Sequence, residues 1–193
     1  MLVPKKSLGQ NFLIDKNICL KISKLININN LDILEIGPGT GNLTDFIIKL
    51  NPKKLILLEK DEELYRFLKK KYLNFRNVQI FNIDALEYDF STTSSSQIIS
   101  NLPYNISTKI IKKILLCDKY FEKLIFMLQK EVAQKINSKK NTKNNKLNFI
   151  IESTSNFKFE FNVSSNVFYP KPKIQSAVIS IKPFKSIRFD KKK

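Results

Sequence analysis

Residues 33–41 read ILEIGPGTG, a short apolar run that ends in a cluster of glycines. The apolar run predicts a buried strand. The glycines let the backbone turn sharply and let a ligand come close, because no Cβ stands in the way. Apolar residues at Leu43, Phe46, Ile47 and Leu50 then recur at helical spacing. This stretch therefore predicts a strand, a glycine-rich turn and a helix, the opening unit of a ligand-binding α/β fold.

The same alternation of apolar runs and helical patterns continues on both sides of this unit. Further strands are predicted at residues 55–58, 78–83, 98–99 and 124–128. Further helices are predicted at residues 14–26, 61–71, 106–116 and 130–136. Residues 157–161 and 177–181 are strands with no helix between them, so we expect an antiparallel pair. The predicted fold is Rossmann-like α/β, a mostly parallel seven-stranded sheet with helices on both faces and an antiparallel edge hairpin.

The composition excludes several kinds of chemistry. The chain has 193 residues, which fits one domain, and it has no histidine. Serine–histidine and cysteine–histidine catalysis are therefore excluded. Cys19 and Cys117 lie far apart and outside any CxxC pattern, so we expect neither a disulfide framework nor a metal site. No apolar run reaches the ~18 residues of a membrane span, and residues 1–10 have no signal-peptide core, so we expect a cytoplasmic protein with no membrane partner.

The net charge of +17 predicts a polyanionic partner. A genome rich in A and T would also raise the number of lysines, but it would not favour one end of the chain. Residues 1–133 carry 20 basic and 14 acidic side chains, whereas residues 134–193 carry 14 basic and 3 acidic ones. This uneven distribution favours a binding role for the basic residues near the C-terminus.

Two acidic residues end the strands that follow the glycine cluster. Glu59 ends the second strand, where a carboxylate can accept hydrogen bonds from both hydroxyls of a ribose. Asp84 ends the third strand, where it can accept one from an adenine amino group. A glycine loop is also what a dinucleotide site would use, but nothing here is placed to hold a pyrophosphate. Together with Gly37 and Gly39 in the turn, the two acids favour S-adenosylmethionine as the cofactor.

The fourth strand ends in Asn101-Leu102-Pro103-Tyr104-Asn105, at the edge of the sheet where ligands bind. An adenine amino group is a poor nucleophile, because its lone pair is delocalised into the ring. The Asn101 side-chain oxygen and the Leu102 carbonyl can accept from the amino hydrogens and so localise that lone pair. Pro103 fixes the local backbone, and the Tyr104 ring can stack on an extruded base. The segment predicts a catalytic site for methyl transfer to adenine.

Four longer motifs give the chain a resemblance to a known family. They are LGQNFL at 8–13, NLPYNIS at 101–107, MLQKEV at 127–132 and VFYPKPKIQSAV at 167–178. With the glycine loop, they resemble the small-subunit rRNA adenine N6-dimethyltransferases over essentially all of residues 5–183. The resemblance implies a class I S-adenosylmethionine-dependent methyltransferase. Its implied substrate is a pair of adjacent adenosines in the hairpin near the 3′ end of small-subunit rRNA, each of which receives two methyl groups.

The resemblance also assigns roles to individual residues. It implies cofactor contacts at Asn11, Leu13, Gly37, Glu59, Asp84 and Asn101. It implies base contacts at Asn101, Tyr104 and Phe168, with Phe168 stacking on the target adenine. The expected partner is small-subunit rRNA within an assembling small ribosomal subunit, and the protein is expected to act as a monomer in ribosome biogenesis.

Two departures from the family concern RNA binding rather than methyl transfer. Family members continue into a small helical C-terminal domain, whereas this sequence stops at Lys193. Where the family has a glycine and an arginine, this chain reads Asn144-Asn145-Lys146. We expect a basic arm, a methyltransferase domain and a basic tail, at residues 1–13, 14–185 and 186–193. RNA is then expected to be held through phosphate contacts of three basic segments, namely Lys5 and Lys6, residues 135–146 and the tail.

Three other functions are compatible with these patterns. The first is a macrolide-resistance methyltransferase, which modifies one adenosine of large-subunit rRNA; the motifs at 101–107 and 167–178 favour the small-subunit family instead. The second is a non-catalytic assembly or transcription factor on the same fold, against which the intact Asn101 and Tyr104 argue. The third is a DNA adenine methyltransferase, for which the sequence offers no separate base-reading domain.

Overall fold

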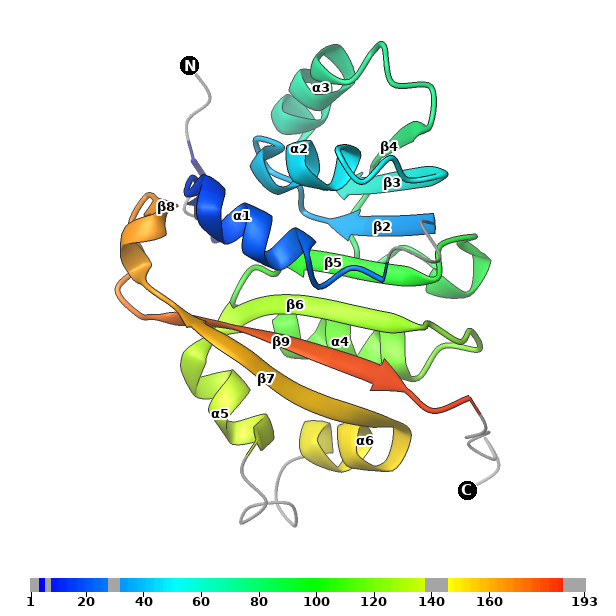
Figure 1. Ribbon diagram of the computed structural model, residues 1–193, viewed down its shortest axis with the longest axis vertical. Coiled ribbons are helices and arrows are strands. Elements are labelled where there is room, and N and C mark those ends of the chain that lie inside the picture. Colours follow the sequence, from blue (N-terminus) through cyan, green and yellow to red (C-terminus); the bar gives the residue numbers. More distant parts are fainter. Residues whose placement is uncertain (1–3, 6–7, 28–31, 138–145, 186–193) are drawn as a thin grey trace.

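The structure, a computed structural model, describes residues 4–5, 8–27, 32–137 and 146–185. Its centre is a seven-stranded sheet (Figure 1). The strands are β2 (Asp32–Ile36), β3 (Lys54–Glu59), β4 (Val78–Asn82), β5 (Gln97–Asn101), β6 (Lys123–Gln129), β7 (Ser155–Val163) and β9 (Ser176–Pro183). They lie in the order β4-β3-β2-β5-β6-β9-β7, in which the first five run parallel and β9 runs antiparallel to both of its neighbours. The predicted Rossmann-like sheet with an antiparallel edge hairpin is therefore confirmed.

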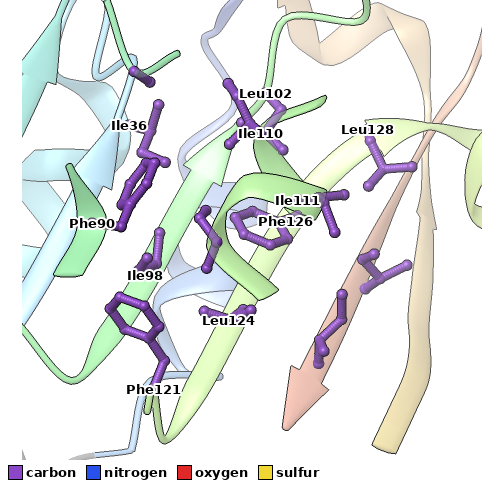
Figure 2. Close-up of a cluster of buried hydrophobic side chains, with 14 of the residues drawn as sticks. Ile36, Phe90, Ile98, Leu102, Ile110, Ile111, Phe121, Leu124, Phe126 and Leu128 are labelled. Atoms are coloured by element: carbon purple, nitrogen blue, oxygen red, sulfur yellow. The ribbon is translucent and has the colours of Figure 1, made fainter. Parts of the chain in front are cut away.

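Helices cover both faces of this sheet. The helices are α1 (Lys16–Ser23), α2 (Asn42–Ile48), α3 (Glu62–Lys71), α4 (Ser107–Leu115), α5 (Lys130–Asn137) and α6 (Lys146–Thr154). The first three pack on one face and the last three on the other. Successive strand residues face opposite sides, so that in β6 Phe126 joins the core under α4 and Met127 joins the core under α1. Figure 2 shows part of the core under α4, including Phe126 and Ile111. None of the helices in the described ranges is long and apolar enough to cross a bilayer.

Short acidic side chains fix where two of the helices begin. The Asp15 carboxylate accepts a hydrogen bond from the Ile18 amide at 2.9 Å and caps α1. The Asp61 carboxylate accepts from the Glu63 and Leu64 amides and caps α3. Such caps satisfy amides that have no partner inside the helix. Because Asp61 lies two residues after the end of β3, its cap also fixes the strand end that carries Glu59.

A second, two-stranded sheet was not predicted from the sequence. It pairs β1 (Phe12–Leu13) with β8 (Phe168–Tyr169), so that Phe12 faces Tyr169 and Leu13 faces Phe168. Through this pairing, the last two residues of the segment predicted as a basic arm, Phe12 and Leu13, contact the rest of the domain. The small sheet lies near the carboxyl ends of β2 and β5 (Figure 1). Residues 138–145 of the basic segment predicted at 135–146, and the predicted tail at 186–193, lie outside the described residues.

Candidate active site

A pocket opens at the carboxyl ends of β2, β3, β4 and β5. It contains every predicted cofactor residue and most of the predicted catalytic ones. Its lining includes Asn11, Leu13, Gly37, Gly39, Glu59, Asp84, Asn101, Leu102, Pro103 and Tyr104. Parallel strands bring their carboxyl ends to one edge of a sheet, and this geometry unites residues that are far apart in the sequence. Within the described ranges, no group of histidine, cysteine and acidic side chains could hold a metal ion.

The glycine loop, residues 37–41, lies between β2 and α2. Gly37 has a φ of +63°, and a Cβ placed there would meet no atom within 4 Å, so the loop leaves open space for a ligand. Gly41 has a φ of +81°, and a Cβ there would collide with the Tyr72 hydroxyl. That hydroxyl lies 2.9 Å from the Gly41 carbonyl oxygen and 2.7 Å from an Asp45 carboxylate oxygen, and its single proton is shared between these two acceptors. Lys71 Nζ adds a hydrogen bond to the Thr40 carbonyl at 3.1 Å. The loop is therefore held from behind by the end of α3.

Glu59 lies at the end of β3 with only 5 % of its surface exposed. Its two carboxylate oxygens accept hydrogen bonds from the Gly39 amide at 3.1 Å and the Asp61 amide at 2.9 Å. Burial raises the pKa of Glu59, and the bonds from the Asp61 and Gly39 amides oppose that shift. Each carboxylate oxygen can accept about two hydrogen bonds. Both oxygens therefore keep acceptor capacity for a pair of hydroxyls, and the residue fits the predicted ribose contact.

Asp84 follows β4 on the neighbouring side of the pocket. Its carboxylate forms an ion pair with Lys60 Nζ at 2.7 Å and accepts from the Leu86 amide at 2.8 Å. Burial disfavours its charged form, but the hydrogen bonds from Lys60 and Leu86 outweigh burial, so the pKa of Asp84 lies below its ordinary value. Asp84 is therefore ionised at neutral pH and can accept a hydrogen bond from an amino group.

Asn101 ends β5, and its side-chain amide has a defined orientation. Its Nδ2 donates to the backbone carbonyl of Asn11 at 3.1 Å. A carbonyl only accepts hydrogen bonds, so the nitrogen must face Asn11 and Oδ1 must be the other end of the amide. Asn11 in turn donates its own Nδ2 to the Gly9 carbonyl at 3.2 Å. The N-terminal segment thus presents Asn101 with its acceptor oxygen available to a substrate amino group.

Phe168 is the predicted site residue that the structure does not bring to the pocket. It is 3 % exposed and packs in the core that also contains Leu13 and Val163. It is absent from the residues that line the pocket. Its neighbour Tyr169 is 60 % exposed, because successive residues of β8 face opposite sides. The predicted stacking of Phe168 on the target adenine therefore does not match its position in this structure, where its ring is part of the core.

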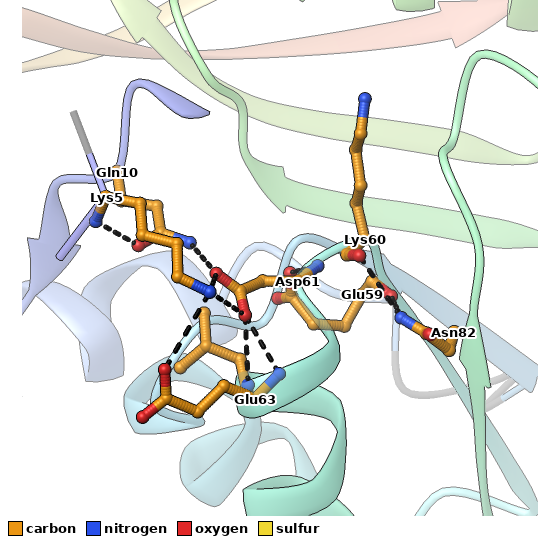
Figure 3. A network of polar contacts seen from close by, with 8 residues as sticks. Lys5, Gln10, Glu59, Lys60, Asp61, Glu63 and Asn82 are labelled. Atoms are coloured by element: carbon orange, nitrogen blue, oxygen red, sulfur yellow. Dashed lines mark hydrogen bonds and ion pairs between the residues drawn. The ribbon is translucent and has the colours of Figure 1, made fainter. Parts of the chain in front are cut away.

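Sequence reasoning also missed the contacts that hold the N-terminal segment over the pocket. Lys5 Nζ lies 2.8 Å from an Asp61 carboxylate oxygen, and Gln10 donates to the same carboxylate at 3.0 Å (Figure 3). Lys5 was predicted to contact RNA phosphates, but here it pairs with the α3 cap. Lys6, predicted to act with it, lies outside the described residues. No local pattern signals the pairing of Lys5 with Asp61, because the two residues are distant in the sequence.

A glycine loop, two strand-end acids and an oriented amide around one pocket are what a class I methyltransferase needs. The family described as "Ribosomal RNA adenine dimethylase" matches residues 2–193, and the chain belongs to this family. This membership confirms the predicted enzyme, an rRNA adenine dimethyltransferase, and its cofactor, S-adenosylmethionine.

Individual relatives agree with that membership. The chain is 42 % identical to the ribosomal RNA small subunit methyltransferase A of Pelagibacter ubique, over 93 % of this chain and 70 % of that protein. It is 43 % identical to the protein of the same name from Malacoplasma penetrans, over 95 % of this chain and 68 % of the relative. Among solved structures, a dimethyladenosine transferase from Plasmodium falciparum superposes with a TM-score of 0.80 at 27 % identity, covering 90 % of this chain and 63 % of that one. The 23S rRNA methyltransferase ErmE shares the fold, with a TM-score of 0.78 at 23 % identity over 91 % of this chain and 71 % of that one.

Proposed function

We propose that this protein dimethylates the N6 amino groups of two adjacent adenosines in the 3′-terminal hairpin of small-subunit rRNA. The observation that carries the proposal is the shared pocket, in which Asn101 Oδ1 is available beside the glycine loop. A cofactor-binding loop and an amino-group acceptor in one pocket suit direct methyl transfer to an exocyclic amine. The similarity to small-subunit methyltransferases favours small-subunit rRNA over large-subunit rRNA as the substrate.

The cofactor residues act by binding and orientation. S-adenosylmethionine supplies an electrophilic methyl group when it is bound. Glu59 accepts hydrogen bonds from the ribose hydroxyls, and Asp84 accepts one from the adenine amino group of the cofactor. Gly37 leaves room for the remaining part of the ligand, because its side of the loop is open. Asn11 and Leu13 close the pocket from the N-terminal side.

The catalytic residues act on the target amino group. Asn101 Oδ1 and the Leu102 carbonyl accept hydrogen bonds from the N–H groups of the amine and localise its lone pair for attack. Pro103 holds the turn, since its carbonyl accepts from the Ile106 and Ser107 amides at 3.2 and 3.1 Å. Tyr104 covers the face of the extruded base. Because stabilisation grows as charge develops on the nitrogen, these contacts favour the transition state over the bound substrate.

The substrate context follows from what the pocket can recognise. The pocket holds a single base, and lysine contacts to phosphate carry little sequence information. The shape of the substrate must then supply selectivity, which favours a partly assembled small subunit over free rRNA. We place the enzyme in the cytoplasm with the assembling ribosome, and we assign it a monomeric state because one chain supplies the whole pocket.

The test is to map methylated adenosines by primer extension on rRNA from cells that lack this protein. We expect a stop at two adjacent adenosines of the 3′-terminal hairpin in control cells and its loss in the deleted strain. The purified chain should restore the stop on small subunits from that strain in the presence of S-adenosylmethionine, and Asn101→Ala should not. A stop that persists in the deleted strain, or one restored only on large-subunit rRNA, would show that the proposed substrate is wrong.

A further inference from the structure

The segment that joins β8 to β9 contacts lining residues of the pocket at both of its ends. We call residues 169–175 the rim loop. At its start, Tyr169 pairs with Phe12 across the small sheet, and Phe12 lines the pocket. Paired Cα atoms of such strands lie roughly 5 Å apart. At its end, Ser176 Oγ lies 2.6 Å from the hydroxyl of Tyr104, which also lines the pocket. Both ends of the rim loop are therefore fixed to pocket walls.

Alternate residues of the rim loop face solvent. Tyr169, Lys171, Lys173 and Gln175 are exposed, whereas Pro172 is buried between them. The loop is anchored at Gln175, because the Lys130 amide donates to its carbonyl at 3.0 Å and Lys130 Nζ donates to its side-chain oxygen at 2.9 Å. Neither Lys171 nor Lys173 is among the residues that form ion pairs in the described structure. The exposed side of the loop thus presents an aromatic ring and two cations in a row.

We infer that the rim loop binds the single-stranded RNA next to the target adenosine, with Tyr169 stacking on a flanking base. This inference rests on the proposed function, since it assumes an RNA substrate. An adenosine that enters the pocket brings its neighbouring nucleotides close to the pocket walls, and the rim loop is fixed to two of these walls, at Phe12 and Tyr104. The Tyr169 ring is 60 % exposed, and stacking on a base would remove part of this apolar surface from water. Every base has a face on which a ring can stack.

The two lysines continue the same path. Lys171 and Lys173 are two residues apart and both are exposed, and the flexible lysine side chains let their ammonium groups adjust to the spacing of successive phosphates. Lys171 and Lys173 can therefore contact consecutive phosphates while Tyr169 holds the base. The sequence from Phe168 to Ser176 contains no acidic residue that would repel the strand. Position and charge together favour RNA over an acidic peptide, which would not use the exposed ring as a stacking surface.

The test measures binding of two adenosine-centred single-stranded RNAs, a 5-mer and an 11-mer, by fluorescence anisotropy with saturating S-adenosylhomocysteine. Tyr169→Ala should weaken the 11-mer about tenfold, as loss of one base stack requires, and should affect the 5-mer less. Tyr169→Phe should bind as the wild type does. Lys171→Ala with Lys173→Ala should lower the slope of log affinity against log salt by roughly 1.4, since each phosphate contact on a single strand contributes about 0.7.

Two matched controls lie away from the pocket. Phe149→Ala removes an aromatic ring of similar exposure, 63 %, from α6. Lys49→Ala with Lys53→Ala removes the same charge from the connection between α2 and β3. This connection leads into the amino end of β3, whereas the pocket lies at the carboxyl ends of the strands. Both should leave RNA affinity within about twofold of the wild type. An unchanged melting temperature and S-adenosylhomocysteine affinity in Tyr169→Ala would show that its pocket is intact.

A second measurement separates this inference from the proposed function. Methyl transfer is followed on small subunits from cells that lack the enzyme. If the wild type methylates them and Tyr169→Ala has the same KM and the same 11-mer affinity, the rim loop is not an RNA site and the proposed function stands. If the 11-mer results are as expected but the wild type transfers no methyl group to the subunits, the rim loop binds RNA and the proposed substrate is wrong.

Discussion

The Tyr104 hydroxyl lies 2.6 Å from Ser176 Oγ and joins the NLPY turn to the first residue of β9. Ser176 is fully buried, and Tyr104 is partly buried in the wall of the pocket. Burial raises the pKa of Tyr104, while the bond to Ser176 opposes that shift. The phenol is therefore neutral at physiological pH and serves to hold its ring in place.

Ser176→Ala should slow methyl transfer without loss of the fold. A neutral hydrogen bond is worth about 0.5–1.5 kcal/mol, so kcat/KM for RNA should fall about 3–10-fold while S-adenosylhomocysteine affinity is unchanged. Tyr104→Phe should have the same effect, because it removes the other half of the bond. Steady-state kinetics of the double variant provides the check: its loss should equal that of either single variant. Additive losses would mean that the two residues act separately.

Glu59→Gln should weaken cofactor binding. The amide keeps the shape of the side chain but has only one acceptor oxygen, and its nitrogen would face the Gly39 or Asp61 amide. Hydrogen bonds to a charged group contribute about 1.5–3 kcal/mol, so the Kd for S-adenosylmethionine should rise at least about tenfold, and Glu59→Ala should do the same. Calorimetry at pH 7.5 measures this directly. Unchanged affinity in both variants would remove Glu59 from the cofactor site.

Asn101→Ala should abolish methyl transfer while the protein still folds. The variant loses the Oδ1 acceptor and the bond to the Asn11 carbonyl, and Asn101 is only partly buried. Because the lost contact strengthens in the transition state, kcat should fall by more than about 100-fold with little change in KM. Asn101→Asp tests the two roles of the side chain separately. It keeps an acceptor oxygen for the substrate, but its second oxygen would repel the Asn11 carbonyl to which Asn101 Nδ2 donates. Near wild-type kcat for the alanine variant would disprove the mechanism.

The sequence predicted the central sheet and the pocket because both depend on local signals. Short apolar runs mark strands, and acids at strand ends meet at one edge of a parallel sheet whatever the loops do. This is why Glu59, Asp84 and Asn101 lie around one pocket as expected.

Contacts between distant short segments could not be predicted in this way. The β1–β8 pair joins strands of two residues, which are too short for periodicity to show which side each residue faces. The resemblance that implied a base contact for Phe168 carried no information on this pairing, in which Phe168 is buried and Tyr169 is exposed. The role of Tyr72 was missed for a related reason, because it depends on how the end of α3 packs against the glycine loop.

Phe168→Leu should lower stability rather than act on catalysis alone. The ring is 3 % exposed in a close-packed core, and its replacement by a smaller side chain should cost about 1–2 kcal/mol. For a chain of this size, each kcal/mol lowers Tm by roughly 2–4 °C. Thermal melting is the measurement, with Tyr169→Leu as the exposed control that should leave Tm unchanged. A normal Tm with strongly reduced activity would show instead that Phe168 turns out of the core to stack on the adenine.

Tyr72→Phe should weaken cofactor binding through the glycine loop, although Tyr72 does not line the pocket. The ring is buried among the side chains beneath α2 and α3 and keeps this packing in the variant. What is lost is the hydroxyl, whose one proton is shared between the Gly41 carbonyl and the Asp45 carboxylate. The loop then has one anchor fewer, and Lys71 alone holds it from behind.

We expect the Kd for S-adenosylhomocysteine to rise about 3–10-fold in this variant, as loss of one positioning hydrogen bond implies, with the KM for RNA unchanged. Tyr65→Phe, the same chemical change on the same helix, is the matched control and should alter neither quantity. Calorimetry and steady-state kinetics together distinguish the outcomes, because a purely structural role would lower Tm and leave cofactor affinity of the folded protein intact. That result would mean that the bond to Gly41 stabilises the domain without shaping its cofactor loop.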